Sequence, residues 1–158
     1  MTQDLILASG SKIRATLLRN AGVTFRVTTA RIDETAVRAA LTAEAATPRD
    51  VADALAEMKA RKIAAKEQAA LVIGCDQVLA LGSDILSKPE RPDDAIAQLP
   101  ALRGPGHHVL SAAVIYAEGQ PQWRHVGAVR MHMRDVSDDY IADYVGRNWE
   151  EIRFCVGS

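Results

Sequence analysis

The stretch LVIGCD, residues 71–76, indicates the fold class, because a continuous apolar run of buried-strand length ends there at an acidic residue. A second apolar strand, residues 5–8, is followed by Ser9-Gly10-Ser11 and then by a helix that we expect to run to Ala21. A longer helix is predicted to open at residues 47–50, where a proline stands in the first turn. Strands therefore alternate with helices in the first half of the chain.

In the second half the predicted strands pair with one another. Residues 78–81 and 85–86 flank a Gly-Ser-Asp turn, which is typical of a hairpin. Residues 109–116 and 126–133 predict two long strands joined around residues 119–121. This order of elements predicts an α/β protein of mixed α+β character, a single domain with a central mixed twisted sheet flanked by helices. The other expected elements are a strand at 25–28, helices at 35–46, from 92 and from 137–139, and an apolar strand at 152–156.

Composition excludes several classes of protein. The chain has 158 residues, of which 48% are hydrophobic and 25% charged, as expected for a globular domain. Its 19 Lys and Arg against 20 Asp and Glu give a net charge of −1, so no basic excess indicates a nucleic acid partner. No apolar run is long enough to cross a membrane. With no signal peptide and only two cysteines, we expect a reduced, cytoplasmic protein.

The loop between the first strand and the first helix could bind phosphate. Ser9, Gly10 and Ser11 stand where the helix begins, and Lys12 and Arg14 lie in its first turn. Free backbone N–H groups, the helix dipole and a guanidinium together favour an anion. The alternative is an ordinary serine N-cap with solvated basic residues, which the local pattern alone favours.

Three carboxylates could form a catalytic or metal-binding group. Asp76 comes directly after a buried strand, at the sheet edge where α/β proteins place ligands. Asp33 and Glu34 follow another expected strand and could join the same cluster. Such carboxylates hold divalent cations or accept a proton from water. The alternatives are a turn aspartate and an acidic pair at a helix N-terminus, each favoured by spacing alone.

Two lysines could neutralise a polyphosphate. Lys59 lies on the longer helix between Met58 and Ala60, and Lys88 precedes a proline. For either residue taken singly, a surface lysine is the favoured interpretation. Cys75 is interpreted as a small buried residue rather than a nucleophile.

Seven motifs in this order resemble the Maf family of nucleoside triphosphate pyrophosphatases: LASGSKIRATLLRNAG, IDET, AEMKARKIA, VIGCDQVLAL, LSKP, LRGPGHHV and VSDDYIADYV. The resemblance implies a mixed α/β fold with a deep nucleotide-binding cleft, similar to that of inosine triphosphatases. It also implies a divalent metal cofactor such as Mg²⁺ or Mn²⁺, a cytoplasmic homodimer and a nucleoside triphosphate substrate. The implied reaction is hydrolysis between the α- and β-phosphates, which releases a nucleoside monophosphate and pyrophosphate.

Site roles follow from the resemblance position by position. Asp76 matches the family's proposed general base, and with Glu34 it is expected to hold the metal. The expected substrate- and phosphate-binding residues are Ser9, Ser11, Arg14, Lys59 and Lys88.

Two positions point to the nucleobase. The family loop usually has an arginine where this chain has Ile13, and members acting on dTTP and UTP have a threonine where it has Gln77. An apolar Ile13 suits packing against a base, and Gln77 offers both a donor and an acceptor. This pair resembles the branch that hydrolyses 7-methyl-GTP. The alternatives are dTTP/UTP hydrolysis and a nucleotide-binding regulator of septum formation with little turnover.

The C-terminal residues FCVGS resemble the beginning of a family segment, after which members continue. The resemblance therefore predicts a truncated chain, and the alternative is a short member of the family. If it is truncated, we expect this form to be less stable than a longer parent and to have little or no selective activity.

Overall fold

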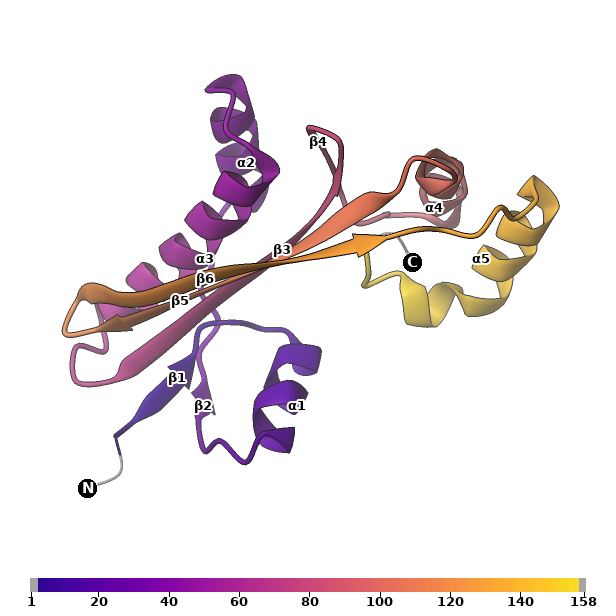
Figure 1. Cartoon of the computed structure of the whole chain (residues 1–158). Coiled ribbons are helices and arrows are strands. Elements are labelled where there is room, and N and C mark those ends of the chain that lie inside the picture. The colour runs from indigo at the N-terminus through magenta and orange to yellow at the C-terminus, as the bar shows by residue number, and fades with distance from the viewer. Residues whose placement is uncertain (1–2, 157–158) are drawn as a thin grey trace. The chain divides into compact units, whose positions relative to one another are not determined.

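The computed structural model describes residues 3–156, which form strands and helices in alternation at first and then paired strands (Figure 1). The elements are β1 (Leu5–Leu7), α1 (Lys12–Asn20), β2 (Arg26–Val27), α2 (Glu34–Ala43), α3 (Pro48–Ala64), β3 (Leu71–Leu81), β4 (Asp84–Leu86), α4 (Pro92–Gln98), the 3₁₀ helix η1 (Leu99–Leu102), β5 (His107–Ala117), β6 (Gln120–Met131) and α5 (Asp138–Ile152).

The strands form one mixed sheet in the order β2-β1-β3-β5-β6, with β4 paired to β3. Strand β1 is parallel to both β2 and β3, in a register that sets Ile6 opposite Arg26 and Val72. Strand β4 is antiparallel to β3, which confirms the predicted hairpin. Strands β5 and β6 are joined by Glu118 and Gly119, both with positive φ, the geometry of a tight type I′ hairpin turn. The mixed α/β fold class is confirmed.

The chain divides into two compact units. The first comprises the residues up to Gln77 together with Ser111–Gly127, and the second comprises Val78–Leu110 together with the residues from Ala128 on. The long strands β3, β5 and β6 contribute residues to both.

In the first unit, helix α3 packs one face against the sheet. A capping box between Thr47 and Asp50 begins the helix, and Pro48 occupies its first turn. Gly74 of β3 allows very close packing, because a Cβ at this position would lie 2.1 Å from the carbonyl oxygen of Ala56. The buried face of α3 consists of Val51, Ala52, Leu55, Ala56, Lys59, Ala60, Ile63 and Ala64.

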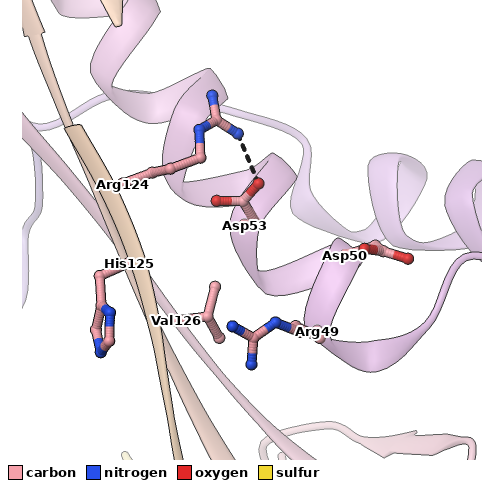
Figure 2. A pocket seen from close by; sticks show the side chains of 6 residues that line it. All are labelled: Arg49, Asp50, Asp53, Arg124, His125 and Val126. Atoms are coloured by element: carbon pink, nitrogen blue, oxygen red, sulfur yellow. Dashed lines mark hydrogen bonds and ion pairs between the residues drawn. The ribbon is translucent and has the colours of Figure 1, made fainter. Parts of the chain in front are cut away.

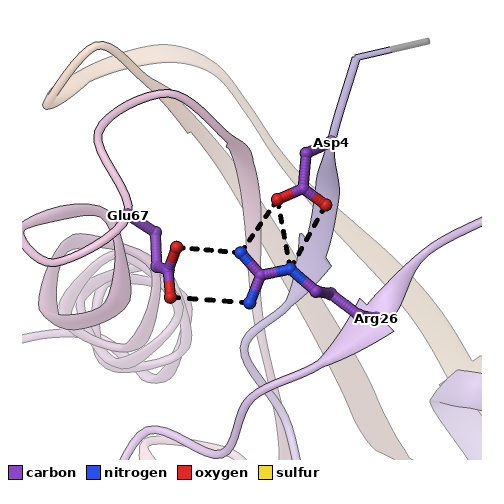
Figure 3. Close-up of polar contacts among 3 residues, drawn as sticks. All are labelled: Asp4, Arg26 and Glu67. Carbon is purple, nitrogen blue, oxygen red and sulfur yellow. Dashed lines mark hydrogen bonds and ion pairs between the residues drawn. The ribbon is translucent and has the colours of Figure 1, made fainter.

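Arg26 joins three segments of the first unit at its surface (Figure 3). Its guanidinium donates to Asp4, just before β1, and to Glu67, just after α3, at 2.8 Å in each case. All three side chains are well exposed to solvent, so the pairs order these segments but stabilise the unit only modestly.

In the second unit, an apolar cluster forms between the helices and β3. Ser137 caps α5 by accepting a hydrogen bond from the Tyr140 amide, as the sequence predicted. The cluster consists of Leu79, Ala95, Leu99, Leu102, Ile141, Val145 and Ile152.

Two expectations about local structure are corrected. The predicted strands 71–75 and 78–81 are one continuous strand, β3, so Asp76 lies within a strand and not after one. The predicted strand at 152–156 is wrong, because Ile152 ends α5 and the following residues form turns and bends. Residues 157 and 158 of the expected C-terminal family segment lie outside the described residues. On α1, Ile13 and Leu17 are more than 60% exposed, and only Ala15 is buried.

Candidate active site

The loop after β1 brings the predicted phosphate-binding residues together. Ser11 caps α1 by accepting a hydrogen bond from the Arg14 amide, at 3.3 Å. The Ser9 hydroxyl accepts from the Ser11 amide at 3.2 Å and from Nη1 of Arg14 at 3.1 Å. The same Nη1 lies 3.3 Å from the carbonyl oxygen of Cys75. The Arg14 guanidinium is therefore held between the loop and the residue that precedes Asp76.

Lys59 joins the two predicted metal ligands. Its Nζ lies 2.9 Å from Oδ1 of Asp76 and 2.8 Å from Oε1 of Glu34. Both Lys59 and Asp76 are buried, at 7% and 4% exposure. We call Glu34, Lys59 and Asp76 the Asp76 cluster. The favoured interpretation of Lys59 as a surface lysine is wrong, because the buried face of α3 directs it to two carboxylates.

Burial raises the pKa of Asp76, which the neighbouring Lys59 ammonium partly offsets. Within the described residues, Oδ2 of Asp76 is buried and has no hydrogen-bond partner. A carboxylate of raised basicity with one unused oxygen is suited to accept a proton or to bind a cation.

Arg38 is a neighbour of this cluster that the sequence analysis missed. Its Nη2 lies 4.0 Å from Oε2 of Glu34, one helical turn earlier on α2. Its Nε is buried and lacks a hydrogen-bond partner among residues 3–156. The spacing of four residues from Glu34 is the signal in the sequence that could have identified it.

The remaining predicted site residues are exposed. Ile13 lies in the first turn of α1, and Gln77 follows Asp76 in β3, where strand alternation turns its side chain to the other face. Lys88 belongs to the second unit, in the loop after β4, and precedes the buried Pro89. Cys75 is half-buried, and burial raises the pKa of its thiol, which favours the protonated form.

Two further cavities are lined by other side chains. One of about 220 Å³ lies between the start of α3 and β6, as Figure 2 shows, and is bordered by Arg49, Asp53 and Arg124. Another, of about 150 Å³, lies in the second unit beside Tyr140 and Tyr144. Neither is lined by a residue predicted to bind the substrate.

The model of the Maf-like protein family matches residues 4–158, nearly the whole chain. The chain belongs to the Maf-like family. The predicted family is thus confirmed, and the match includes both residues 7–22, with the predicted phosphate-binding loop, and residues 72–81, with Asp76.

This Maf-like chain is similar to several curated bacterial proteins. It is 59% identical over 157 residues to a protein of Ruegeria pomeroyi named nucleoside triphosphate pyrophosphatase, covering 99% of this chain and 79% of that relative. It is likewise 59% identical over 158 residues to a protein of the same name from Roseobacter denitrificans, covering 100% of this chain and 79% of the relative. A Brucella abortus protein named 7-methyl-GTP pyrophosphatase is 46% identical over 147 residues, covering 93% and 74%.

Residues 3–156 of the Maf-like chain bear on the membrane and cofactor expectations. No helix there is both long enough and apolar enough to cross a membrane. No set of three or more His, Cys, Asp or Glu gathers there as a metal site. Two carboxylates with an unpartnered Asp76 oxygen nevertheless fit Mg²⁺, which proteins often hold through one or two carboxylates and the substrate phosphates.

Proposed function

We propose that this chain hydrolyses nucleoside triphosphates between the α- and β-phosphates, releasing a nucleoside monophosphate and pyrophosphate. The observation that carries the proposal is the Asp76 cluster, in which a buried carboxylate keeps one oxygen unpartnered beside a buried ammonium. The names of the relatives at 59% identity support the same reaction class.

The residues of this chain divide the chemistry between them. Asp76 accepts a proton from water, and the resulting hydroxide attacks the α-phosphorus. The bond between the α-phosphorus and the oxygen that bridges it to the β-phosphate breaks, and pyrophosphate leaves. Lys59, Arg14 and the N-terminus of α1 offset the negative charge of the polyphosphate. Ser9 and Ser11 orient the loop that receives the phosphates.

Glu34 and Asp76 are the residues that would hold a divalent cation. Such a cation, when bound, neutralises phosphate charge and polarises the phosphoryl group. The Lys59 ammonium already contacts one oxygen of each carboxylate, which leaves Oδ2 as the available oxygen of Asp76.

Within this reaction class, we propose 7-methyl-GTP as the preferred substrate. The exposed Ile13 offers an apolar surface for a base, and the exposed Gln77 offers a donor and an acceptor. The 7-methyl-GTP pyrophosphatase name of a relative at 46% identity supports this choice. An arginine and a threonine at these two positions would instead favour dTTP and UTP.

A panel of triphosphates tests the proposal. The chain is incubated with 7-methyl-GTP, GTP, dTTP and UTP, each with Mg²⁺ or Mn²⁺ or with EDTA, and the monophosphate and pyrophosphate are quantified. We expect equimolar products, fastest from 7-methyl-GTP and lost with EDTA. Release of orthophosphate and a diphosphate would contradict the bond assignment, and a preference for UTP would contradict the substrate assignment.

A further inference from the structure

Arg38 of α2 lies beside the Asp76 cluster, but its guanidinium is not fully hydrogen-bonded there. The distance of 4.0 Å between its Nη2 and Oε2 of Glu34 is too long for a hydrogen bond. Its Nε is shielded from solvent and, in the part of the chain described, has no acceptor. A buried N–H group without a hydrogen bond destabilises the folded protein. An acceptor on a bound ligand would remove this cost.

The charges around Arg38 favour an anionic ligand. Glu34 and Asp76 already form ion pairs with the Lys59 ammonium at 2.8 and 2.9 Å. Each carboxylate therefore has a cationic partner without Arg38. Arg14 adds a further cation beside Cys75. The ammonium of Lys59 compensates for the two carboxylates, and the guanidinium groups of Arg38 and Arg14 add positive charge that is complementary to a polyphosphate.

The position of the side chain allows it to reach a substrate. The Arg38 side chain is 23% exposed, so the guanidinium is neither enclosed in the core nor fully solvated. Arg38 neighbours Glu34, which contacts Lys59 at 2.8 Å, and Lys59 contacts Asp76 at 2.9 Å. Arg38 is therefore connected to the proposed catalytic carboxylate through Glu34 and Lys59.

We propose that Arg38 binds the polyphosphate chain of the substrate, with Nε and Nη2 as a two-pronged donor to phosphate oxygens. This inference rests on the proposed function and adds a binding residue to it. A guanidinium presents two parallel N–H donors to a phosphate, whereas a lysine ammonium acts as a point charge. The paired N–H donors of Arg38, which we call the fork, should therefore contribute to phosphate binding in addition to the positive charge.

Two variants separate the fork from the charge. Arg38→Met removes both, and Arg38→Lys keeps the charge alone. Arg147→Met is the matched control, because Arg147 is exposed on α5 and pairs with Asp143 four residues away. Binding of the non-hydrolysable α,β-methylene analogue of GTP is measured in EDTA at low and high salt, beside KM, kcat and thermal unfolding for all forms.

We expect Arg38→Met to raise the Kd and KM roughly 10–100-fold, with kcat changed only a few-fold. Arg38→Lys should give an intermediate Kd, and Arg147→Met the wild-type value. An unchanged Kd in a folded Arg38→Met protein would overturn the inference, as would a lower kcat with unchanged Kd, which indicates that Arg38 only positions Glu34. If Arg38→Met fails to fold, a wild-type Kd in Arg38→Lys overturns the proposed role of the fork. Failure of the wild type to release pyrophosphate would instead contradict the proposed function.

Discussion

The Nζ of Lys59 and Oδ1 of Asp76 lie 2.9 Å apart in the interior of the first unit, and both side chains are less than 10% exposed. The same Nζ contacts the half-exposed Glu34. A buried charge is stable only when an opposite charge or hydrogen bonds compensate for its lost hydration. The pair therefore links the fold of α3 and β3 directly to the proposed catalytic carboxylate.

Replacing Lys59 tests the structural part of this link. Lys59→Met leaves Asp76 without its counter-ion, so we expect the free energy of unfolding to fall by about 3–5 kcal/mol, as measured by urea denaturation at pH 7. Lys66→Met is the control, because Lys66 is exposed just after the same helix. Equal free energies of unfolding for the two variants would show that Asp76 is stable without Lys59.

Replacing Asp76 tests its proposed role as the general base. Asp76→Asn keeps the shape of the side chain but removes its charge and basicity. If Asp76 activates water, pyrophosphate release should fall roughly 10²–10⁴-fold while the circular dichroism spectrum is retained. Turnover close to that of the wild type in the folded variant would exclude Asp76 as the general base.

The close packing at Gly74 makes a separate prediction about stability. In Gly74→Ala, the new Cβ would lie 2.1 Å from the Ala56 carbonyl oxygen and 2.6 Å from the Ala60 amide nitrogen, so α3 and β3 must separate. We expect a loss of about 1–3 kcal/mol in the free energy of unfolding. Gly146→Ala is the matched control within helix α5. There no described atom beyond the adjacent residues and the backbone of the same helix lies within 4 Å of the new Cβ, and a gain of about 0.5–1 kcal/mol is expected. Equal melting temperatures for the two variants would contradict the close contact.

Exchange of the two exposed specificity residues tests the substrate. Ile13→Arg combined with Gln77→Thr should shift relative kcat/KM away from 7-methyl-GTP and toward UTP by about 10–200-fold, the range for contacts of this kind. The single variants show which position acts. A wild-type protein that already prefers UTP would contradict 7-methyl-GTP as the substrate, whereas the proposed reaction class would still hold.

The sequence predicted the elements well where the signals are local. Ser11 and Ser137 were expected at helix starts and do cap α1 and α5. The position of Asp76 was predicted less well, because a polar pair in an apolar run resembles the end of a strand. In the structure β3 continues through Asp76 and Gln77, and the Lys59 ammonium compensates for the buried carboxylate.

The partner of Asp76 could not be predicted from local pattern. Lys59 lies 17 residues earlier in the chain, and its contact depends on how α3 packs across β3. The four-residue spacing from Glu34 could have identified Arg38, but the burial of its Nε without a partner among residues 3–156 depends on packing. The strand expected at 152–156 was wrong because apolar residues after α5 resemble a strand, whereas Ile152 completes the apolar face of the helix.

A surface network predicts how stability depends on pH. Arg124 of β6 donates to Asp53 at 2.7 Å and to Glu57 at 2.8 Å, and the buried Tyr116 of β5 donates to Glu57 at 2.8 Å. The hydrogen bond from Arg124, followed by that from Tyr116, lowers the pKa of Glu57 below its ordinary value of 4.5. The ionised form of Glu57 therefore stabilises the folded state, which binds its proton less readily than the unfolded chain does.

The sign of the effect follows from this lowered pKa. The contribution of Glu57 is fully present above pH 4.5 and is lost as the pH falls through the lower pKa of the folded state. Because the Glu57 side chain is 31% exposed, solvent screening limits the contribution to about 1 kcal/mol. Glu57→Gln should thus be less stable than the wild type at pH 7, and the difference in the free energy of unfolding should shrink between about pH 5 and 3. Glu151→Gln, exposed on α5, is the control measured beside it. A difference for Glu57→Gln that stays constant over this range would mean that packing of the side chain, rather than its charge, stabilises the network.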